Sequence, residues 1–357
     1  MARYLEGKAV RRWVPLVLLL AVVMGFPFYV MLNLRPYRPG ATETVTVHVA
    51  AGASMSDVAD LLYRHHLIRN PVFFRYYARL LHLDSRLQPG EYALSQGMSP
   101  AQILRMLTEG QVVVHRVTIP EGMTVREIAD LLDAQGVVSR DEFLAAAAAA
   151  SHLVDEYLPA DVELEQPLEG YLFPATYEYR TGVTAEELLS MMVERFRQVW
   201  TPELLQRADE LKMSIHEVVT LASIIEEEAQ VADERARISG VYHNRLRVGM
   251  KLDADPTVAY AVGKLPGEEL TLEDLAVDSP YNTYRYAGLP PGPIACPGEA
   301  SILAALYPEE HDYWYFVARG DGSGRHFFAR TLEEQERNIE TYQANLAARR
   351  EAEESGE

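Results

Sequence analysis

The sequence predicts an α+β protein with an N-terminal transmembrane helix, small units of strands and helices, and a larger helix-rich mixed α/β domain. Three observations predict this fold class: a long apolar run near the N-terminus, an internal repeat after it, and helical periodicity in the second half of the chain. The chain has 357 residues, enough for about two or three domains. Because 48% of the residues are hydrophobic, extensive cores can be buried.

The composition excludes several classes of function. The formal net charge is −19, from 33 basic and 52 acidic residues. No nucleic-acid partner is expected, because phosphate binding needs clustered lysine and arginine. Cys296 is the only cysteine, so an intrachain disulfide and a zinc site of several cysteines are both excluded. We expect no metal and no cofactor, since no ligand cluster with suitable spacing is visible.

The first element is the charge-free apolar run Val14–Leu32, which has about the length needed to cross a bilayer. Basic residues precede it, which favours a cytoplasmic N-terminus. These are Arg3, Lys8, Arg11 and Arg12. The alternative is a cleaved signal peptide, but the run is too long for one and no small-x-small cleavage site follows. We expect an uncleaved anchor at residues 14–34, with the chain after about Pro36 outside the cytoplasm.

The next elements form an internal repeat, in which the segment from Val47 aligns without a gap with the segment from Val117. Each copy predicts a strand, a glycine turn, a helix that starts at Ser or Thr, and a second helix. The matching pairs are Val49 and Ile119, Gly52 and Gly122, Ser54 and Thr124, Val58 and Ile128, the two ADLL segments at 59–62 and 129–132, and Phe73 and Phe143.

The two copies differ in their endings. In the first copy Pro71 opens the second helix, and Gly90–Leu94 supplies a closing strand. In the second copy the alanines Ala145–Ala150 continue the second helix. A strand–helix–helix–strand unit resembles LysM, a module that binds glycans containing N-acetylglucosamine. The alternative is a small α+β spacer that packs against the rest of the protein.

Helices follow, near Ala185–Trp200 and from about Ser214, where Ser214 and Glu217 form a capping box. At about 100° per residue, one face of the second helix is apolar. Its members are Val218, Leu221, Ala222, Ile225 and Ala229. The following glutamates then divide: Glu227 lies opposite this face in solvent, while Glu226 and Glu228 lie at its two borders.

A carboxyl group at the edge of an apolar surface is partly desolvated, which raises its pKa and suits it to general acid catalysis. The periodicity therefore removes Glu227 as a candidate acid and leaves Glu226 and Glu228 open. It also leaves open the plain interpretation of a charged helix border.

Five separated motifs then point to a known family. In chain order they are LEGYLFPATY, LASIIEEEA, RISGVYHNRLRVGMKLDADPTVAYAVG, SPYNTYRYAGLPPGPIACPG and YWYFVARGDGSGRHFF. Together they resemble the YceG/MltG family of membrane-anchored endolytic murein transglycosylases, from the anchor to about residue 345. The resemblance implies a single-pass protein of the bacterial inner membrane whose catalytic domain lies in the periplasm or outside the cell.

The resemblance also implies a catalytic residue and a reaction. The family's acid is the first glutamate after the ASI-aliphatic run, which is Glu226 here. The substrate would be the β-1,4 bond between N-acetylmuramic acid and N-acetylglucosamine within peptidoglycan glycan strands. Glu226 would protonate the glycosidic oxygen and then help the muramyl 6-hydroxyl attack its own anomeric carbon. This gives a 1,6-anhydro end with one carboxylate, where glycosidases ordinarily use two.

Several neighbouring residues are candidates for substrate binding. Asn282 could bind an N-acetyl group, and Tyr281 or Tyr284 could stack on a sugar face, although a braced turn with core tyrosines is the alternative. Asp255 is interpreted first as a helix N-cap before Pro256 and second as a polar group of the cleft.

Two further residues, Glu169 and Tyr171, are placed on the opposite side of the cleft.

Other polar residues are expected to support the site without touching substrate. Glu228 would supply negative charge that keeps Glu226 protonated. Glu234, Arg235, Asn244 and Arg245 would orient one another and the catalytic helix.

Two positions depart from the family pattern. Cys296 stands where a polar amide is more usual, so a loop contact is expected to differ. Gln335 stands where the family often has a histidine, so no role of that histidine transfers. His326 is either a residue of the cleft or a structural histidine.

The predicted organisation follows from these elements. We expect a cytoplasmic tail (1–13), a transmembrane helix (14–34), a LysM-like domain (44–112), a second α+β repeat (113–160), a catalytic domain (161–345) and an acidic, frayed tail (346–357). The predicted partners are glycan strands, the membrane and peptidoglycan synthases, with cleavage ending the elongation of nascent strands. The alternative function is a non-catalytic peptidoglycan-binding scaffold that recruits cell-wall synthases.

Overall fold

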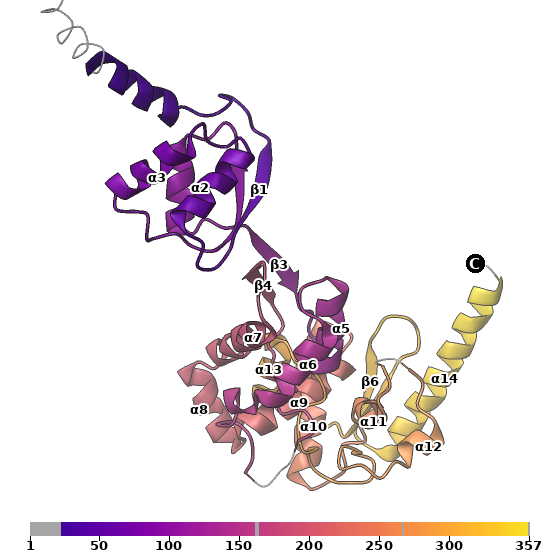
Figure 1. Ribbon diagram of the computed structural model, residues 1–357. Coiled ribbons are helices and arrows are strands. Elements are labelled where there is room, and N and C mark those ends of the chain that lie inside the picture. Colours follow the sequence, from indigo (N-terminus) through magenta and orange to yellow (C-terminus); the bar gives the residue numbers. More distant parts are fainter. Residues whose placement is uncertain (1–22, 161–163, 266–267, 356–357) are drawn as a thin grey trace, which may run out of the picture. The chain divides into compact units, whose positions relative to one another are not determined.

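The computed structural model describes residues 23–160, 164–265 and 268–355, and Figure 1 shows them as a ribbon. The chain divides into two compact units. Unit 1 contains Met1–His115 and Glu178–Gly182, and unit 2 contains Arg116–Tyr177 and Val183–Glu357. Helices dominate both units, and the strands of the described residues pair into two-stranded sheets, which confirms a mixed helix and strand protein.

After the N-terminal helical residues 23–34, unit 1 folds around two paired strands and the helices between and after them. Along the chain these are β1 (Thr44–Val49), α2 (Met55–Arg64), α3 (Pro71–Leu80), β2 (Gly90–Ser95) and α4 (Pro100–Glu109). The strands are antiparallel, with Thr44 opposite Ser95 and Val49 opposite Gly90. Buried side chains of all five elements share one core, among them Val47, Leu62, Phe74, Tyr92 and Leu104.

The order strand, helix, helix, strand is therefore confirmed for the first copy of the repeat. Pro71 begins α3 and Gly90 begins β2, as predicted. The helix starts match between the copies, because Ser54 caps α2 and Thr124 caps α5 (Val125–Ala134), each in a capping box. A LysM-like role in binding glycan stays a prediction.

The N-terminal region is described only from residue 23. Residues 23–34 are helical, whereas the predicted tail at 1–13 and the first part of the predicted span at 14–34 lie outside the described residues. Within the described part of the chain, every helix is too short or too polar to cross a membrane. The helical residues are fixed to unit 1, since the ring of Tyr29 lies 5.9 Å from that of Phe73 and its hydroxyl accepts a hydrogen bond from Asn70 at 3.1 Å.

Unit 2 begins within β3 (Val114–Thr118), which pairs with β4 (Thr176–Arg180). Its other elements are α5, α6 (Arg140–Ala149), α7 (Ala185–Val199), α8 (Pro202–Leu211), α9 (Ile215–Glu228), α10 (Arg235–Arg247), α11 (Asp255–Val262), α12 (Leu272–Leu275), α13 (Glu299–Leu306), β5 (Tyr315–Ala318), β6 (His326–Ala329) and α14 (Leu332–Ser355). Short 3₁₀ turns occur at Ser151–Leu153 and Ala232–Glu234. The predicted starts of α7 and α9 and the continuation of α6 through the alanines are confirmed.

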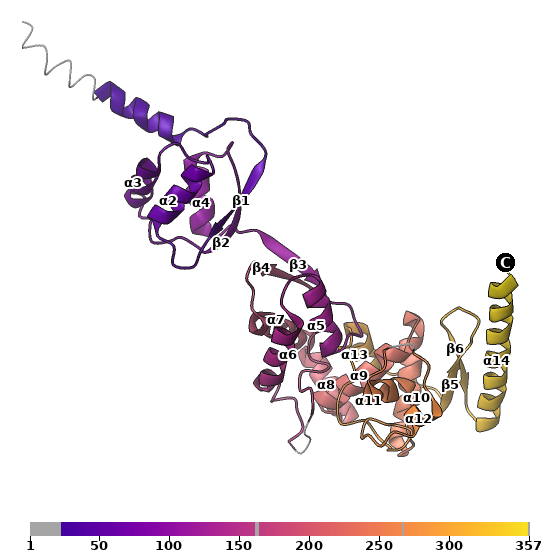
Figure 2. The ribbon, with the colours of Figure 1, turned by 45° about the vertical axis from the view of Figure 1, so that its right-hand side comes forward.

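Helix α9 lies at the centre of unit 2, where it packs against α8, α10, α11 and α13 (Figure 1 and Figure 2). His216 and every residue from 218 to 225 are buried. The expectation of a single apolar face was therefore wrong, because neighbouring helices cover α9 all round. This matters for the glutamates that end the helix, since none of them faces open solvent.

The C-terminal helix α14 packs on β5 and β6 and continues to Ser355. The expectation of a frayed acidic tail was wrong over residues 351–355, and residues 356–357 lie outside the described part. Alanine, glutamate and arginine dominate the end of the helix, and their high helix propensities outweigh the acidic charge.

Candidate functional site

The candidate site lies at the C-terminal end of α9, around Glu226. The side chain of Glu226 is only 7% exposed and accepts two hydrogen bonds. Arg235 donates to its Oε1 at 3.3 Å, and the backbone N–H of Gly298 donates to its Oε2 at 2.9 Å. The predicted acid thus lies between two hydrogen-bond donors at the point where α9, α10 and α13 meet.

Backbone hydrogen bonds hold the walls of this site together. The N–H of Gly122 donates to the carbonyl of Cys296 at 3.0 Å, and the N–H of Cys296 donates to the carbonyl of Met123 at 2.9 Å. The Ser223 hydroxyl accepts from the N–H of Ile294 at 3.0 Å. The glycine turn of the second repeat and the loop before α13 are therefore fixed against α9.

Gly298 is the N-cap of α13, so its N–H belongs to the positive end of that helix. Arg235 begins α10, and its Nε also donates to Ser301 of α13 at 3.2 Å. Both donors of Glu226 are thus held by secondary structure. Sequence analysis placed Arg235 among the orienting residues, and the structure shows that it contacts the candidate acid directly.

Glu227 corrects one prediction. It was expected in solvent, but it is partly buried, and burial, followed by the negative charges of Glu127 and Glu226, raises the pKa of Glu227 to about 7. Its carboxyl lies against Gly122, where a Cβ would come within 2.9 Å of Oε1. The error arose because the Gly122 turn of the second repeat covers the helix face that was taken to be exposed.

Gly122→Ala is expected to lower both stability and activity. The position has φ +81°, which costs an alanine about 1 kcal/mol, and the new methyl group would displace the Glu227 carboxyl. Gly136→Ala is the matched control, because Gly136 has φ +66° with nothing within 4 Å of an added Cβ. Thermal unfolding should show similar losses of stability for both variants, while enzymatic activity should fall only for Gly122→Ala. Equal activities would contradict a role of this contact in the site.

Glu228 belongs to a second polar group on the other side of α9. Its Oε1 accepts from the hydroxyl of the buried Tyr242 at 2.9 Å. Burial raises the pKa of Glu228 to about 7, with smaller contributions from the charges of Asp255 and Glu227. Tyr284 donates to Asp255 Oδ1 at 2.6 Å, and burial and this bond raise the pKa of Tyr284. Glu228, Asp255 and Tyr284 are thus brought together.

The expectation that Asp255 caps α11 was wrong. The N-cap is Ala254, without a side-chain hydrogen bond, and Asp255 is the first helical residue. Its carboxylate is exposed and is occupied by Tyr284 instead. The alternative interpretation, a polar group of the cleft, is compatible with this placement.

Asn282 is fully buried, which corrects its prediction as an N-acetyl ligand. Its amide donates to the carbonyls of Leu275 and Val277 at 3.0 and 2.9 Å, and its Oδ1 accepts from the N–H of Tyr284 at 3.0 Å. Both amide N–H donors and one lone pair of Oδ1 therefore serve the loop. Tyr281 is half-buried, and burial raises the pKa of its hydroxyl to about 12.

Glu169 and Tyr171 lie in the interior rather than along a cleft. Glu169 is 4% exposed and accepts from the N–H of Val125 at 3.0 Å and from Tyr260 at 3.3 Å. Burial raises the pKa of Glu169 to about 8. Tyr171 is fully buried, with its hydroxyl 2.8 Å from Nδ1 of His216. The LEGYLF motif therefore builds the core beside α5 and α9.

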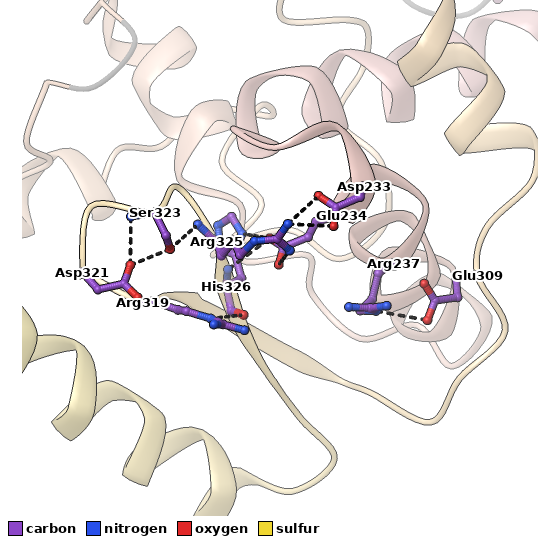
Figure 3. Close-up of polar contacts among 9 residues, drawn as sticks. All are labelled: Asp233, Glu234, Arg237, Glu309, Arg319, Asp321, Ser323, Arg325 and His326. Atoms are coloured by element: carbon purple, nitrogen blue, oxygen red, sulfur yellow. Dashed lines mark hydrogen bonds and ion pairs between the residues drawn. The ribbon is translucent and has the colours of Figure 1, made fainter.

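Glu234 anchors the β5–β6 hairpin to the start of α10 (Figure 3). Its Oε2 accepts from the backbone N–H of His326 at 3.0 Å and lies 2.9 Å from Nδ1 of the same residue. Arg325 adds an ion pair at 3.7 Å. His326 is buried against Glu234, which favours a structural histidine over a residue of the cleft.

Asn244 and Arg245 of α10 brace neighbouring loops. Asn244 donates to the carbonyls of His311 and Tyr313 at 2.9 and 3.0 Å. Arg245 donates to the carbonyl of Trp314 at 2.7 Å and to Asp253 Oδ2 at 3.1 Å. Asn244 and Arg245 thus support the surroundings of the site by holding loops. They were expected to orient one another, and these hydrogen bonds go to the loops instead.

The two departures from the family pattern are both in the interior. Cys296 is fully buried, and burial raises the pKa of its thiol well above the ordinary range. Its backbone makes the bridge to the Gly122 turn, so its side chain is not required for that contact. Gln335 donates to the carbonyl of Phe316 at 3.0 Å and joins α14 to β5.

Sequence reasoning missed Glu121, which precedes Gly122 in the turn before α5. Its carboxyl lies where a Cβ on Gly298 would be, directly beside the N–H that Glu226 accepts. The signal was present in the repeat, where Ala51 occupies the matching position of the first copy. Among the described residues, no group of three or more His, Cys, Asp and Glu is arranged to hold a metal ion.

The chain is similar to several known proteins. The YceG-like family matches residues 47–341. The chain is 34% identical over 335 residues to an endolytic murein transglycosylase of Bacillus subtilis, with 90% of this chain and 91% of that protein covered. A Streptococcus pneumoniae protein of the same name is 31% identical over 337 residues, and the match covers 87% of this chain but 60% of that protein.

A solved structure is also similar. The crystal structure of a YceG-like protein from Listeria monocytogenes has 37% sequence identity and a TM-score of 0.58, and the match covers 83% of this chain and 99% of that chain.

Proposed function

The chain belongs to the YceG-like family, and we propose that it is an endolytic murein transglycosylase with Glu226 as its catalytic residue. The substrate is the β-1,4 bond between N-acetylmuramic acid and N-acetylglucosamine within peptidoglycan strands, and the product carries a 1,6-anhydro end. The observation that supports this best is the placement of Glu226, whose carboxyl is nearly buried between a guanidinium and a helix N-terminus.

The geometry suits a carboxyl group that acts first as an acid and then as a base. Gly298 fixes Oε2 at 2.9 Å, whereas the 3.3 Å contact of Oε1 with Arg235 is longer than an ordinary charge-assisted hydrogen bond. We therefore assign the transferable proton to Oε1. When that proton leaves, Arg235 and the Gly298 N–H stabilise the resulting carboxylate without any rearrangement.

The reaction balances with this one group. The proton of Glu226 moves to the glycosidic oxygen as the bond from that oxygen to the muramyl anomeric carbon breaks. The muramyl 6-hydroxyl oxygen then bonds to the same carbon, and its proton returns to Glu226. No water is consumed, which distinguishes this cleavage from hydrolysis.

The remaining parts of the proposal concern place and partners. The apolar run at 14–34 anchors the chain in the bacterial inner membrane, with residues 44–345 on the outer side of that membrane. Residues 44–112 bind glycan as a LysM-like unit, and residues 113–160 belong with the catalytic part at 161–345. Strand cleavage ends the elongation of nascent strands in association with peptidoglycan synthases. The tight contact of Tyr29 with Phe73 supports this arrangement, since it fixes unit 1 to the end of the apolar segment.

Product analysis tests the proposal. The full-length chain in detergent is incubated with purified murein sacculi, and the released fragments are reduced with borohydride and analysed by mass spectrometry. We expect internal cleavage with ends that are lighter by one water than hydrolysis products and resist reduction. Reducible ends would identify a hydrolase instead, and binding to sacculi without release would favour a scaffold.

A further inference from the structure

The turn between β3 and α5 places a second carboxyl group beside the catalytic one. Glu121 extends from this turn so that its carboxyl occupies the space over Gly298 that the Cβ of any other residue would take. The N–H of the same Gly298 donates to Glu226 Oε2 at 2.9 Å. Two carboxyl groups from different parts of the chain therefore converge on one backbone position at the start of α13.

Two nearby charges, those of Glu226 and Arg235, act on Glu121 in opposite directions. Burial and the negative charge of Glu226 raise the pKa of Glu121, and the positive charge of Arg235 opposes them. Arg235 also donates a hydrogen bond to Glu226 at 3.3 Å. The positive charge of one guanidinium therefore acts on both carboxyl groups. These groups come from α9 and α10, while α13 contributes the N–H of Gly298.

The turn itself does not need this carboxyl. In the first repeat copy Ala51 occupies the matching position, and the glycines that follow, Gly52 and Gly122, have similar φ values of +76° and +81°. Both turns lead into helices with a capping box. The glutamate in the second copy therefore adds something other than the ability to form the turn.

We propose that Glu121 is a positioning residue of the active site that controls the charge of Glu226. Held over Gly298, the Glu121 carboxylate shares Arg235 with Glu226 and favours the protonated form of Glu226 with which the reaction starts. The inference rests on the proposed function, because it assumes that Glu226 must deliver a proton. Glu121 acts through electrostatics, since a like charge nearby disfavours ionisation of a carboxyl group.

The test is the pH dependence of murein cleavage by the full-length chain, measured for the wild type and Glu121→Gln. Glutamine keeps the size of the side chain but removes its charge. We expect the alkaline limb of the activity profile to move to lower pH by about one unit, while activity at the acid end is retained. At a fixed pH on the alkaline limb this is a loss of up to about tenfold.

Gly298→Ala provides an independent variant. Gly298 has φ −74°, which alanine adopts without strain, and the new methyl group would push the flexible Glu121 carboxyl away. We expect a shift in the same direction as for Glu121→Gln. Because both changes act on one carboxylate, the double variant should match Glu121→Gln alone rather than show the two effects added. Glu340→Gln removes a charge from an exposed site on α14 and should leave the profile unchanged.

Each outcome decides the question. A Glu121→Gln profile that coincides with the wild type, or that falls equally at every pH, overturns the inference, because a merely structural role lowers activity without moving the limb. If Glu121→Gln does not fold, an unshifted profile of Gly298→Ala overturns it instead. If the wild type cleaves murein and Glu226→Gln cleaves it equally well, the assignment of Glu226 fails first, and the inference falls with it.

Discussion

Glu226→Gln is expected to reduce the release of anhydro-muropeptides by at least about 10³-fold. General acid–base groups typically contribute about 10²- to 10⁴-fold, and here one carboxyl performs both the acid and the base step. Glutamine can still accept the N–H of Gly298 through its amide oxygen, so the local structure should be preserved. It has no proton to give to the glycosidic oxygen. The measurement is quantified release from sacculi at substrate excess, with thermal unfolding of the same samples.

Glu228→Gln is the matched control for this variant. Glu228 lies two residues further along α9 and was the other candidate acid from periodicity. Its amide counterpart can keep the hydrogen bond from Tyr242, whereas Gly298 and Arg235 donate to Glu226. We expect a much smaller loss of activity than for Glu226→Gln. If the two losses of activity were equal, or if that of Glu228→Gln were greater, the assignment of the catalytic role to Glu226 would be wrong.

Glu169→Gln is expected to stabilise the protein at alkaline pH. Burial raises the pKa of Glu169 from an ordinary 4.5 to about 8 in the folded chain. Below about pH 4.5 the carboxyl is neutral in both the folded and the unfolded state. Between about 4.5 and 8 the unfolded chain loses the proton while the folded chain keeps it, so the free energy of unfolding falls as pH rises. Above about 8 this contribution is constant.

The size of the effect follows from the same shift. At about 1.4 kcal/mol per pKa unit, the wild type forfeits up to about 5 kcal/mol across this range, and Glu169→Gln does not titrate. The amide oxygen can still accept from the N–H of Val125, and the amide N–H can donate to the hydroxyl oxygen of Tyr260 in place of the bond that Tyr260 donates to Glu169. Denaturant unfolding followed by tryptophan fluorescence at pH 5 and pH 8 should show a gap between variant and wild type that widens with pH. Parallel pH curves would contradict a neutral, buried Glu169.

The local rules of the sequence predicted those parts of the fold that short segments determine. Ser54, Thr124 and Ser214 were identified as helix starts from residue type and local pattern, and in the structure each completes a capping box within four residues. Pro71 and Gly90 likewise begin the elements that their backbone preferences indicate. The repeat was visible because its two copies keep the same spacing. These features need no knowledge of what packs against them.

The errors arose where packing decides. Glu227 was assigned to solvent because helical periodicity cannot show that the turn at Gly122, far earlier in the sequence, covers that face. Asn282 and Tyr171 have chemistry that suits a sugar, but both are fully buried. Glu121 was missed because its neighbours, Gly298 and Arg235, are distant in sequence. Residue type alone does not distinguish a ligand of substrate from a brace of the loop that holds it.

The paired backbone hydrogen bonds between Cys296 and the turn at Gly122 and Met123 have a practical consequence for dissecting this protein. A truncated chain that starts at residue 161 would retain α9 but lose the Gly122 turn that packs beside it. The orphaned amide and carbonyl at Cys296 would need new partners, each at a cost of about 1–3 kcal/mol. A fragment purified for activity measurements should therefore start upstream of β3. It should include the second repeat copy as well as residues 161–345.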